Sequence, residues 1–352
     1  MSRKLVVLTQ GFARKLNAKT AVSLLRYRPE QVVAVLDDQE AGQSAQALFG
    51  VGGDIPVVAS LDEVKGADTL LIGIATPGGT LPAPMRANIL DAIGRGLNVE
   101  SGLHQFLCDD PEISHAAYEA GVTLNDVRKN DERDVSQRKD INETCLRIQT
   151  VGHDCSVGKM VVAIELAEAL KKAGRDAAFV ATGQTGIMIE GSGIPIDCVV
   201  ADFVNGACEK LVLHNQQHEM MVIEGQASLV QPRYSSVSLG LLHGCVPHGL
   251  VMCYEMGRER VYGMDQTLPI PPLKDIIQLY KQMVDHLYPG RFIGIAMNSR
   301  NIKDDAAVED ERQRLRDELG LPVCDVIRHG PDELVQATLD LQQELRNKGS
   351  LK

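Results

Sequence analysis

Hydrophobic positions in the first 125 residues cluster in short runs of β-branched residues, each followed by a stretch with the apolar spacing of a helix. This alternation is typical of β-α-β units that build a parallel sheet covered by helices on both faces. We therefore predict a Rossmann-like parallel-sheet domain over residues 1–127. Its strands are expected at 4–8, 32–37, 69–75, 97–100 and 122–126.

A second α/β series follows a polar segment of mixed charge. Residues 128–140, RKNDERDVSQRKD, hold almost only polar side chains, so we predict a linker at 128–142 and a second domain at 143–352. The second series predicts another doubly wound sheet. Its strands are expected at 145–151, 177–182, 220–225, 250–255, 291–297 and 322–327, and its helices at 159–173, 205–217, 235–243, 271–288, 304–319 and 331–346.

The segment TVGHDCSVGKM, residues 150–160, lies between a predicted strand and a predicted helix. In such a loop, backbone N–H groups and the helix N-terminus surround a phosphate, and a lysine adds a point charge. The pattern departs from G-x-x-x-x-G-K-[ST] because Gly152 stands one residue early and Met160 replaces the hydroxyl that ligates magnesium. Its spacing resembles the phosphate loop of dethiobiotin synthetase, which predicts a P-loop NTPase-like second domain. The predicted cofactor-binding residues are Gly152, Asp154, Cys155, Ser156, Val157, Gly158, Lys159 and Met160.

Two side chains of this loop have alternative interpretations. A carboxylate beside a phosphate nest is repulsive unless it binds a metal or an amine, so we predict that Asp154 is functional. Cys155 is interpreted as a small packing residue, with a nucleophile as the alternative, because His153 is the only histidine near it in sequence.

Two further loops follow predicted strands. Residues 181–209 are rich in glycine and small polar residues, which favours a ligand-binding loop in which backbone approaches the ligand closely. The loop at 223–244 begins at the carboxyl end of a strand, where open α/β sheets bind ligands. Ser235 has two interpretations, a carboxylate ligand and a helix cap. The polar candidates of both loops are Gln184, Thr185, Glu190, Asp197, Asp202, Glu224, Gln226, Arg233, Ser235 and Ser236.

The first domain gives weaker signals. Gly11 lacks the other glycines of the dinucleotide fingerprint, so we interpret Asp37 as a turn acid rather than a ribose ligand. The loop TPGGT at 76–80 is expected to close over a substrate. No histidine has an acidic neighbour at ligand spacing, so we predict no metal site.

Composition narrows the function classes. The chain has 352 residues and a net charge of −11, which disfavours nucleic acid as a partner because like charges repel. The apolar run near the N-terminus has four residues, too few for a signal peptide or a membrane span. The eight cysteines include no C-x-x-C pair, which indicates reduced core residues. We expect a cytoplasmic homo-oligomer that acts on a small molecule and binds neither nucleic acid nor membrane.

The order of these segments, GHDCSVGKM, then the loop at 181–209, then EGQASLVQPRYSSVSLGLLHG, resembles a two-domain bacterial family long classed as a domain of unknown function. That family includes the D-glutamate N-acetyltransferases of a D-glutamate catabolic route. The resemblance implies acetyl transfer from acetyl-CoA to the amino group of D-glutamate.

Two enzymatic mechanisms and one binding role fit the residues. For acetyl transfer, the phosphate loop binds acetyl-CoA, Glu224, Asp202 or Asp154 is the catalytic carboxylate, and the amides of 183–186 stabilise the oxyanion. Arg233 would then bind the substrate carboxylate. Acetyl transfer needs no magnesium, so it is compatible with Met160 in place of the magnesium-binding hydroxyl. The alternatives are an ATP-dependent kinase or ligase, in which Asp154 and Glu224 bind magnesium, and a nucleotide-binding regulator without turnover.

Overall fold

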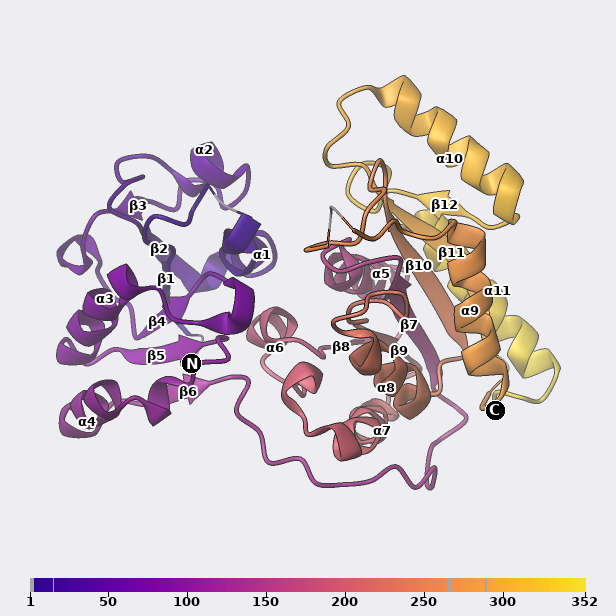
Figure 1. Ribbon diagram of the computed structural model, residues 1–352, viewed down its shortest axis with the longest axis horizontal. Coiled ribbons are helices and arrows are strands. Elements are labelled where there is room, and N and C mark those ends of the chain that lie inside the picture. The colour runs from indigo at the N-terminus through magenta and orange to yellow at the C-terminus, as the bar shows by residue number, and fades with distance from the viewer. Residues whose placement is uncertain (1–2, 15, 265–266, 289) are drawn as a thin grey trace. The chain divides into compact units, whose positions relative to one another are not determined.

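The computed structural model describes residues 3–14, 16–264, 267–288 and 290–352, which form two compact units. The first unit comprises Met1–Asn130 and Ile187–Cys198. The second comprises Asp131–Gly186 and Val199–Lys352. Each is an α/β unit built on a parallel sheet (Figure 1), so the predicted fold class is confirmed.

In the described part of the first unit, six parallel strands follow the order β3-β2-β1-β4-β5-β6. The strand β1 is buried along its whole length because helices cover both faces of the sheet, which matches its uninterrupted LVVL sequence. The strands β2 and β3 lie on one side of β1, and β4, β5 and β6 lie on the other, so the strand order reverses at β1. The strands are β1 (Leu5–Leu8), β2 (Val32–Leu36), β3 (Val57–Val58), β4 (Thr69–Ile72), β5 (Asn98–Ser101) and β6 (Leu124–Asp126), and the helices are α1 (Lys19–Tyr27), α2 (Ala45–Phe49), α3 (Ala83–Gly94) and α4 (Pro111–Ala120).

The described part of the second unit holds another six-stranded parallel sheet, in the order β12-β11-β10-β7-β9-β8. The strands are β7 (Leu146–Gly152), β8 (Ala177–Val180), β9 (Met220–Ile223), β10 (Gly249–Glu255), β11 (Arg291–Asn298) and β12 (Val323–Cys324). The helices are α5 (Lys159–Lys172), α6 (Gln184–Glu190), α7 (Val204–Asn215), α8 (Ser235–Cys245), α9 (Leu273–Asp285), α10 (Asp305–Leu319) and α11 (Asp332–Asn347). The last four residues of α6 belong to the first unit.

The sheet of the second unit lies between two helical layers. On one side α5 packs against β7, β8 and β9, and α11 packs against β11 and β12. On the other side one apolar cluster joins Leu242 of α8, Tyr280 of α9 and Leu315 of α10 to the strands (Figure 1). The strand β7 lies at the centre, with β10 and β9 as its neighbours, so the loop that follows it opens at the point where the strand order reverses.

The polar segment before β7 packs on the second unit. The carboxylate of Glu209 on α7 accepts hydrogen bonds from the Ser136 hydroxyl and from the backbone N–H groups of Gln137, at 3.0 Å, and Arg138, at 2.8 Å. Lys210 binds Glu132 at 3.0 Å. The segment predicted to be a linker is therefore a strap held along α7, and most of it belongs to the second unit.

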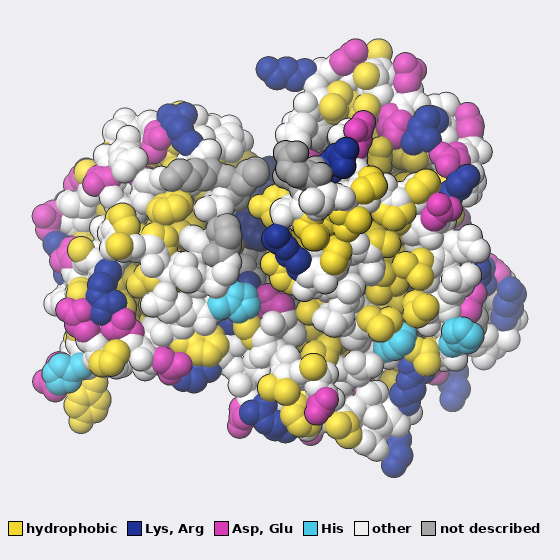
Figure 2. Space-filling view, viewed as in Figure 1, with side chains coloured by type: hydrophobic (Ala, Val, Ile, Leu, Met, Phe, Trp, Pro, Cys, Tyr) yellow, Lys and Arg dark blue, Asp and Glu magenta, His cyan; other side chains and the backbone are white. Residues whose placement is uncertain are grey.

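Two features of the surface bear on function. No helix among the described residues is both long and apolar enough to span a bilayer. Figure 2 shows acidic and basic side chains side by side at the edge occupied by α10. There Arg314 pairs with Glu311 and Glu318 along the helix.

Candidate functional site

The loop after β7 has the backbone of a phosphate-binding loop. It runs from the end of β7 at Gly152 to the start of α5 at Lys159, and Gly158 caps the helix with a φ of 105° that favours glycine. Ser156 also has a positive φ, 56°. The Lys159 ammonium turns back and donates to the Asp154 carbonyl at 2.7 Å, and its burial lowers its pKa from the ordinary value. The loop is thus closed around its own lysine.

Asp154 holds three segments together at this loop. Its side chain is fully buried and both oxygens accept hydrogen bonds. One oxygen accepts from the Cys155 N–H at 2.7 Å and from Gln231 at 3.3 Å, and the other from Arg258 at 3.2 Å and the Tyr262 N–H at 2.6 Å. The alternative in which Asp154 binds magnesium is disfavoured, because its oxygens are engaged by protein donors that include a guanidinium. Among the described residues, no three His, Cys, Asp or Glu side chains are arranged to hold a metal ion.

Arg258 and Glu255 form an ionic network that the sequence analysis missed. Arg258 donates to the Cys155 carbonyl at 2.6 Å and to Glu255 at 2.6 Å. The buried Glu255 carboxylate also accepts from Arg300 at 3.0 Å and Asn301 at 3.1 Å. Two arginines thus lie beside the phosphate loop, at the carboxyl ends of β10 and β11. Their only sequence signal was their position after predicted strands.

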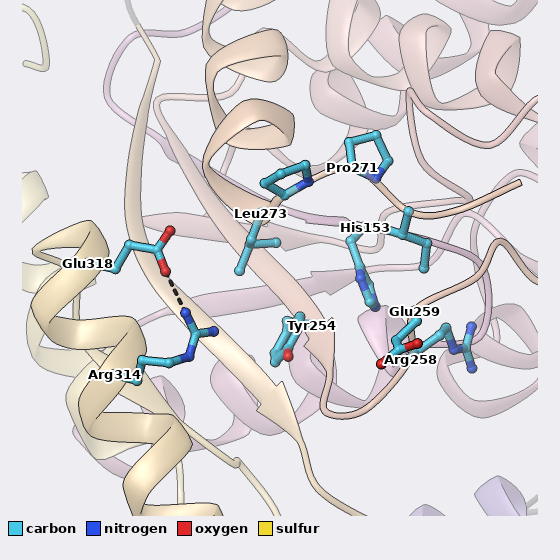
Figure 3. A pocket seen from close by; sticks show the side chains of 10 residues that line it. His153, Tyr254, Arg258, Glu259, Pro271, Leu273, Arg314 and Glu318 are labelled. Carbon is cyan, nitrogen blue, oxygen red and sulfur yellow. Dashed lines mark hydrogen bonds and ion pairs between the residues drawn. The ribbon is translucent and has the colours of Figure 1, made fainter.

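A pocket of about 290 Å³ opens beside this network (Figure 3). Figure 3 shows Arg314 and Glu318 of α10 on one side, joined by an ion pair, and His153 and Arg258 on the other. Tyr254 lies between them and donates to Glu311 at 2.9 Å. The remaining lining residues are Glu259, Ile270, Pro271, Pro272 and Leu273. The pocket therefore combines an apolar wall with charged groups of both signs.

His153 borders this pocket as a neutral side chain. Its Nε2 accepts a hydrogen bond from the Glu255 N–H at 3.1 Å, and its ring lies 5.1 Å from that of Tyr254. Burial, together with the charges of Arg258 and Lys159, lowers the pKa of His153 to about 3. The Nε2 atom of His153 is therefore used as the acceptor for the Glu255 backbone N–H.

The loop predicted at 181–209 contains the helix α6, whose residues Gln184 and Thr185 are buried. The Glu224 carboxylate accepts from the N–H groups of Thr182 at 3.0 Å and Gly183 at 3.1 Å. The expected use of the Gly183 amide as an oxyanion donor is therefore wrong for this arrangement, because Glu224 already occupies it. Glu224 closes the turn between β8 and α6.

The other acidic candidates of this loop lie on different parts of the fold. Glu190 belongs to the first unit and pairs with Arg28 at 3.6 Å. Asp202 is exposed on the short 3-10 helix Ala201–Phe203. Asp197 also belongs to the first unit, where it pairs with Arg128.

The loop between β9 and α8 is held by hydrogen bonds within the second unit, which include the bond from Gln231 to Asp154. Gln226 donates to the Thr182 hydroxyl at 3.1 Å, and its carbonyl accepts from Ser238 at 2.8 Å. Arg233 is exposed and donates to the Gly263 carbonyl at 2.8 Å. The helix-cap interpretation of Ser235 is wrong, because the cap position of α8 is Tyr234 and no side chain caps it. Ser235 and the exposed Ser236 lie in the first turn instead.

Family models and relatives match nearly the whole chain. The P-loop domain of the domain of unknown function DUF1611 matches residues 134–335, and its Rossmann-like domain matches residues 38–130. A D-glutamate N-acetyltransferase of Tritonibacter scottomollicae is 34% identical over 331 residues, which cover 92% of this chain and 94% of the relative. A second D-glutamate N-acetyltransferase, of a Pseudoalteromonas species, is 36% identical over 271 residues, 77% of this chain and 81% of the relative.

A solved structure of a related protein has the same two-domain fold as this chain. The crystal structure of a DUF1611 family protein from Anabaena variabilis is 33% identical, with a TM-score of 0.88 over 96% of this chain and 99% of that one. The Rossmann-like and P-loop domains predicted from the sequence are the two domains that the family models describe. The chain belongs to the DUF1611 family.

Proposed function

We propose that this chain is an N-acetyltransferase that moves the acetyl group of acetyl-CoA to the amino group of D-glutamate. The two relatives named D-glutamate N-acetyltransferase support the reaction and the amino acid. The phosphate loop supports a phosphate-bearing donor, because Lys159, Arg258 and the start of α5 provide cationic and N–H groups at one place.

The observation that carries the choice of donor is the residue after the lysine. Met160 stands where a nucleotide-hydrolysing loop has a hydroxyl for magnesium. A loop without that hydroxyl still binds the phosphates of coenzyme A, and acyl transfer needs no metal on them. The apolar wall and the charged groups of the pocket beside His153 suit an amphipathic donor.

We keep Glu224 as the proposed base for the substrate ammonium. Asp154 is ion-paired with the Arg258 guanidinium, and Asp202 lies on the surface. The hydrogen bonds to Glu224 come instead from the uncharged N–H groups of Thr182 and Gly183. Glu224 follows β9 directly, beside the central strand β7, at the edge where open sheets bind ligands.

The reaction is tested by following free thiol from acetyl-CoA with D-glutamate, and with L-glutamate as the matched control. We expect coenzyme A release and N-acetyl-D-glutamate with the D enantiomer. ADP release from ATP in place of coenzyme A release would instead support the kinase or ligase, and neither product would support a regulator.

The donor site is tested with Lys159→Ala. Loss of a charge-assisted phosphate contact is expected to raise the KM for acetyl-CoA about 10- to 100-fold while the KM for D-glutamate stays near the wild-type value. Lys171→Ala is the matched control, because Lys171 is on the same helix and its ion pair with Glu168 is exposed. An equal rise of both KM values with Lys159→Ala would contradict the assignment.

A further inference from the structure

Four side chains that the proposed function does not use meet in the first unit. The sulfur of Cys198 lies 3.2 Å from Nδ1 of His104. Nε2 of His104 lies 3.8 Å from an Asp197 oxygen, and the Arg128 guanidinium pairs with that carboxylate. Arg128 is also 3.9 Å from the Cys198 sulfur. We call these residues, His104, Arg128, Asp197 and Cys198, the thiol cluster.

The cluster lies where an open α/β sheet presents its ligand site. His104 follows β5 and Arg128 follows β6, so both stand at the carboxyl ends of their strands. Asp197 and Cys198 come from the segment Ile187–Cys198, which belongs to this unit. The sheet thus brings residues far apart in sequence to one edge.

Surrounding contacts hold the cluster in place. Arg128 is buried and donates to the Gly102 carbonyl at 2.7 Å, and Asn130 donates to the Cys198 carbonyl at 3.1 Å. The loop TPGGT packs on His104, because a Cβ at Gly79 would lie 2.5 Å from the imidazole ring. A side chain at position 79 would therefore displace His104.

The cluster is also open to a ligand. The His104 side chain is 43% exposed and Cys198 is partly exposed. The second Asp197 oxygen is buried and has no hydrogen-bond partner among the described residues. A buried acceptor without a partner is unfavourable unless a ligand or water donates to it.

The protonation states suit a base that acts during the reaction. Burial and the neighbouring Arg128 lower the pKa of His104, while burial and Asp197 raise the pKa of the Cys198 thiol. At neutral pH the pair is therefore a neutral thiol beside a neutral imidazole. With its proton on Nε2, which faces Asp197, His104 accepts the thiol proton at Nδ1.

We propose that Cys198 is a nucleophile that takes the acyl group from the thioester donor, with His104 as its general base. The sulfur forms a bond to the acyl carbon while its proton passes to Nδ1 of His104. The carbon–sulfur bond of the donor breaks, and the departing thiolate takes that proton, so one thioester replaces another without oxidation or reduction. The amino group of the substrate then forms a bond to the acyl carbon, and the carbon–sulfur bond to Cys198 breaks. The amine loses one proton to Nδ1 of His104, which passes it to the Cys198 sulfur, so the thiol and the neutral imidazole are restored. The inference rests on the proposed function for the thioester donor.

The first experiment uses a donor without phosphate groups, the acetyl thioester of N-acetylcysteamine, so that its outcome does not depend on the phosphate loop. Acetylation of each cysteine of the full chain is followed by peptide mass spectrometry. Cys108 is the internal reference, because it is also partly exposed and binds Lys129, not a histidine. We expect Cys198 to be acetylated faster than Cys108, and His104→Gln to slow Cys198 about 100-fold without changing Cys108.

Equal acetylation of Cys198 and Cys108, or a His104→Gln variant that leaves their ratio unchanged, would overturn the nucleophile. This holds even if the chain makes N-acetyl-D-glutamate, so the proposed function would survive.

The second experiment uses acetyl-CoA without an amino acid. We expect release of one equivalent of coenzyme A per chain, lost in Cys198→Ala and kept in the control variant Cys108→Ser. Full turnover by Cys198→Ala would overturn the covalent step. If acetyl-CoA is not used at all but the small thioester still acetylates Cys198 through His104, the choice of acetyl-CoA fails and the nucleophile stands.

Discussion

At the scale of single residues, burial decides what His153 does. The ring has 2% exposure, and its Nε2 accepts the Glu255 N–H. Because burial and two nearby cations lower its pKa to about 3, the ring is neutral near pH 7 and fixes the start of the loop that carries Arg258. A protonated ring would lose that acceptor and repel Arg258.

This burial makes stability depend on pH. In the unfolded chain His153 has an ordinary pKa of 6.5, so between about pH 3 and pH 6.5 the unfolded state binds more protons than the folded one. The stabilising contribution is complete above pH 6.5 and is lost as the pH falls. From pH 7 to pH 5 we expect His153 to lower the free energy of unfolding by about 2 kcal/mol.

The measurement is urea unfolding at pH 7 and pH 5 for the wild type and His153→Asn. The variant should lose about 2 kcal/mol less on acidification, because its side chain does not titrate. His115→Asn, at an exposed position of α4, serves as control and should behave as the wild type. If His153→Asn loses as much free energy of unfolding between pH 7 and pH 5 as the wild type, His153 is not the group that makes stability depend on pH.

At the scale of elements, Glu209 of α7 converts a polar stretch into a fixed strap. Its carboxylate accepts from Ser136 and from the Gln137 and Arg138 amides. We predict that Glu209→Gln releases the strap and raises tryptic cleavage after Arg133, Arg138 and Lys139 several-fold. In this variant an NH₂ group replaces one acceptor oxygen and faces the donor groups of the strap, so hydrogen bonds are lost.

Proteolysis followed by mass spectrometry gives the cleavage rates. Glu168→Gln is the matched control, since Glu168 makes an exposed pair with Lys171 on another helix of the same unit. Unchanged cleavage in Glu209→Gln would mean that other contacts, such as Lys210 with Glu132, are sufficient to hold the strap.

Most elements could be predicted from the sequence because their patterns are local. The run VVAVLD gave β2, and the periodic stretch after Lys159 gave α5 with a difference of one residue at its end. The strand β3 was missed because it has two residues, and α6 because Gly186 within it and the glycines on either side, Gly183 and Gly191, favour a loop. Short elements are fixed by neighbours that are distant in sequence.

The candidate site could be predicted only where its residues form a local pattern. Gly158 and Lys159 follow from a motif within one loop, and in the structure they are the cap and the first residue of α5. Arg258 and Gln231 reach Asp154 from loops far along the chain, and no local pattern indicates that they do. Likewise, the pairing of His104 with Cys198 depends on the segment 187–198 joining the first unit.

At the scale of the whole molecule, the chain enters the second unit, returns to the first and then enters the second again. The returning segment Ile187–Cys198 carries apolar side chains that are buried in the full chain, at 1% exposure for Met188, 3% for Ile189 and 0% for Ile196. A cut at the strap therefore separates these residues from the unit to which they belong. The two units are built on separate sheets, and the segment that completes the first unit is inserted between two parts of the second.

The final prediction concerns the fragment 131–352. The residues that surround the phosphate loop, Asp154, Arg258, Glu255 and Arg300, all belong to the second unit, so the fragment is expected to bind coenzyme A with an affinity near that of the full chain. It should also aggregate, because its segment 187–198 exposes apolar side chains that the first unit normally covers. A fragment in which a Gly/Ser linker replaces 187–198 should keep the binding and remain soluble, as measured by calorimetry and light scattering. Coenzyme A binding to residues 1–130 but to neither version of the fragment would move the donor site to the first unit, where His104, Arg128 and the TPGGT loop would then have to hold it.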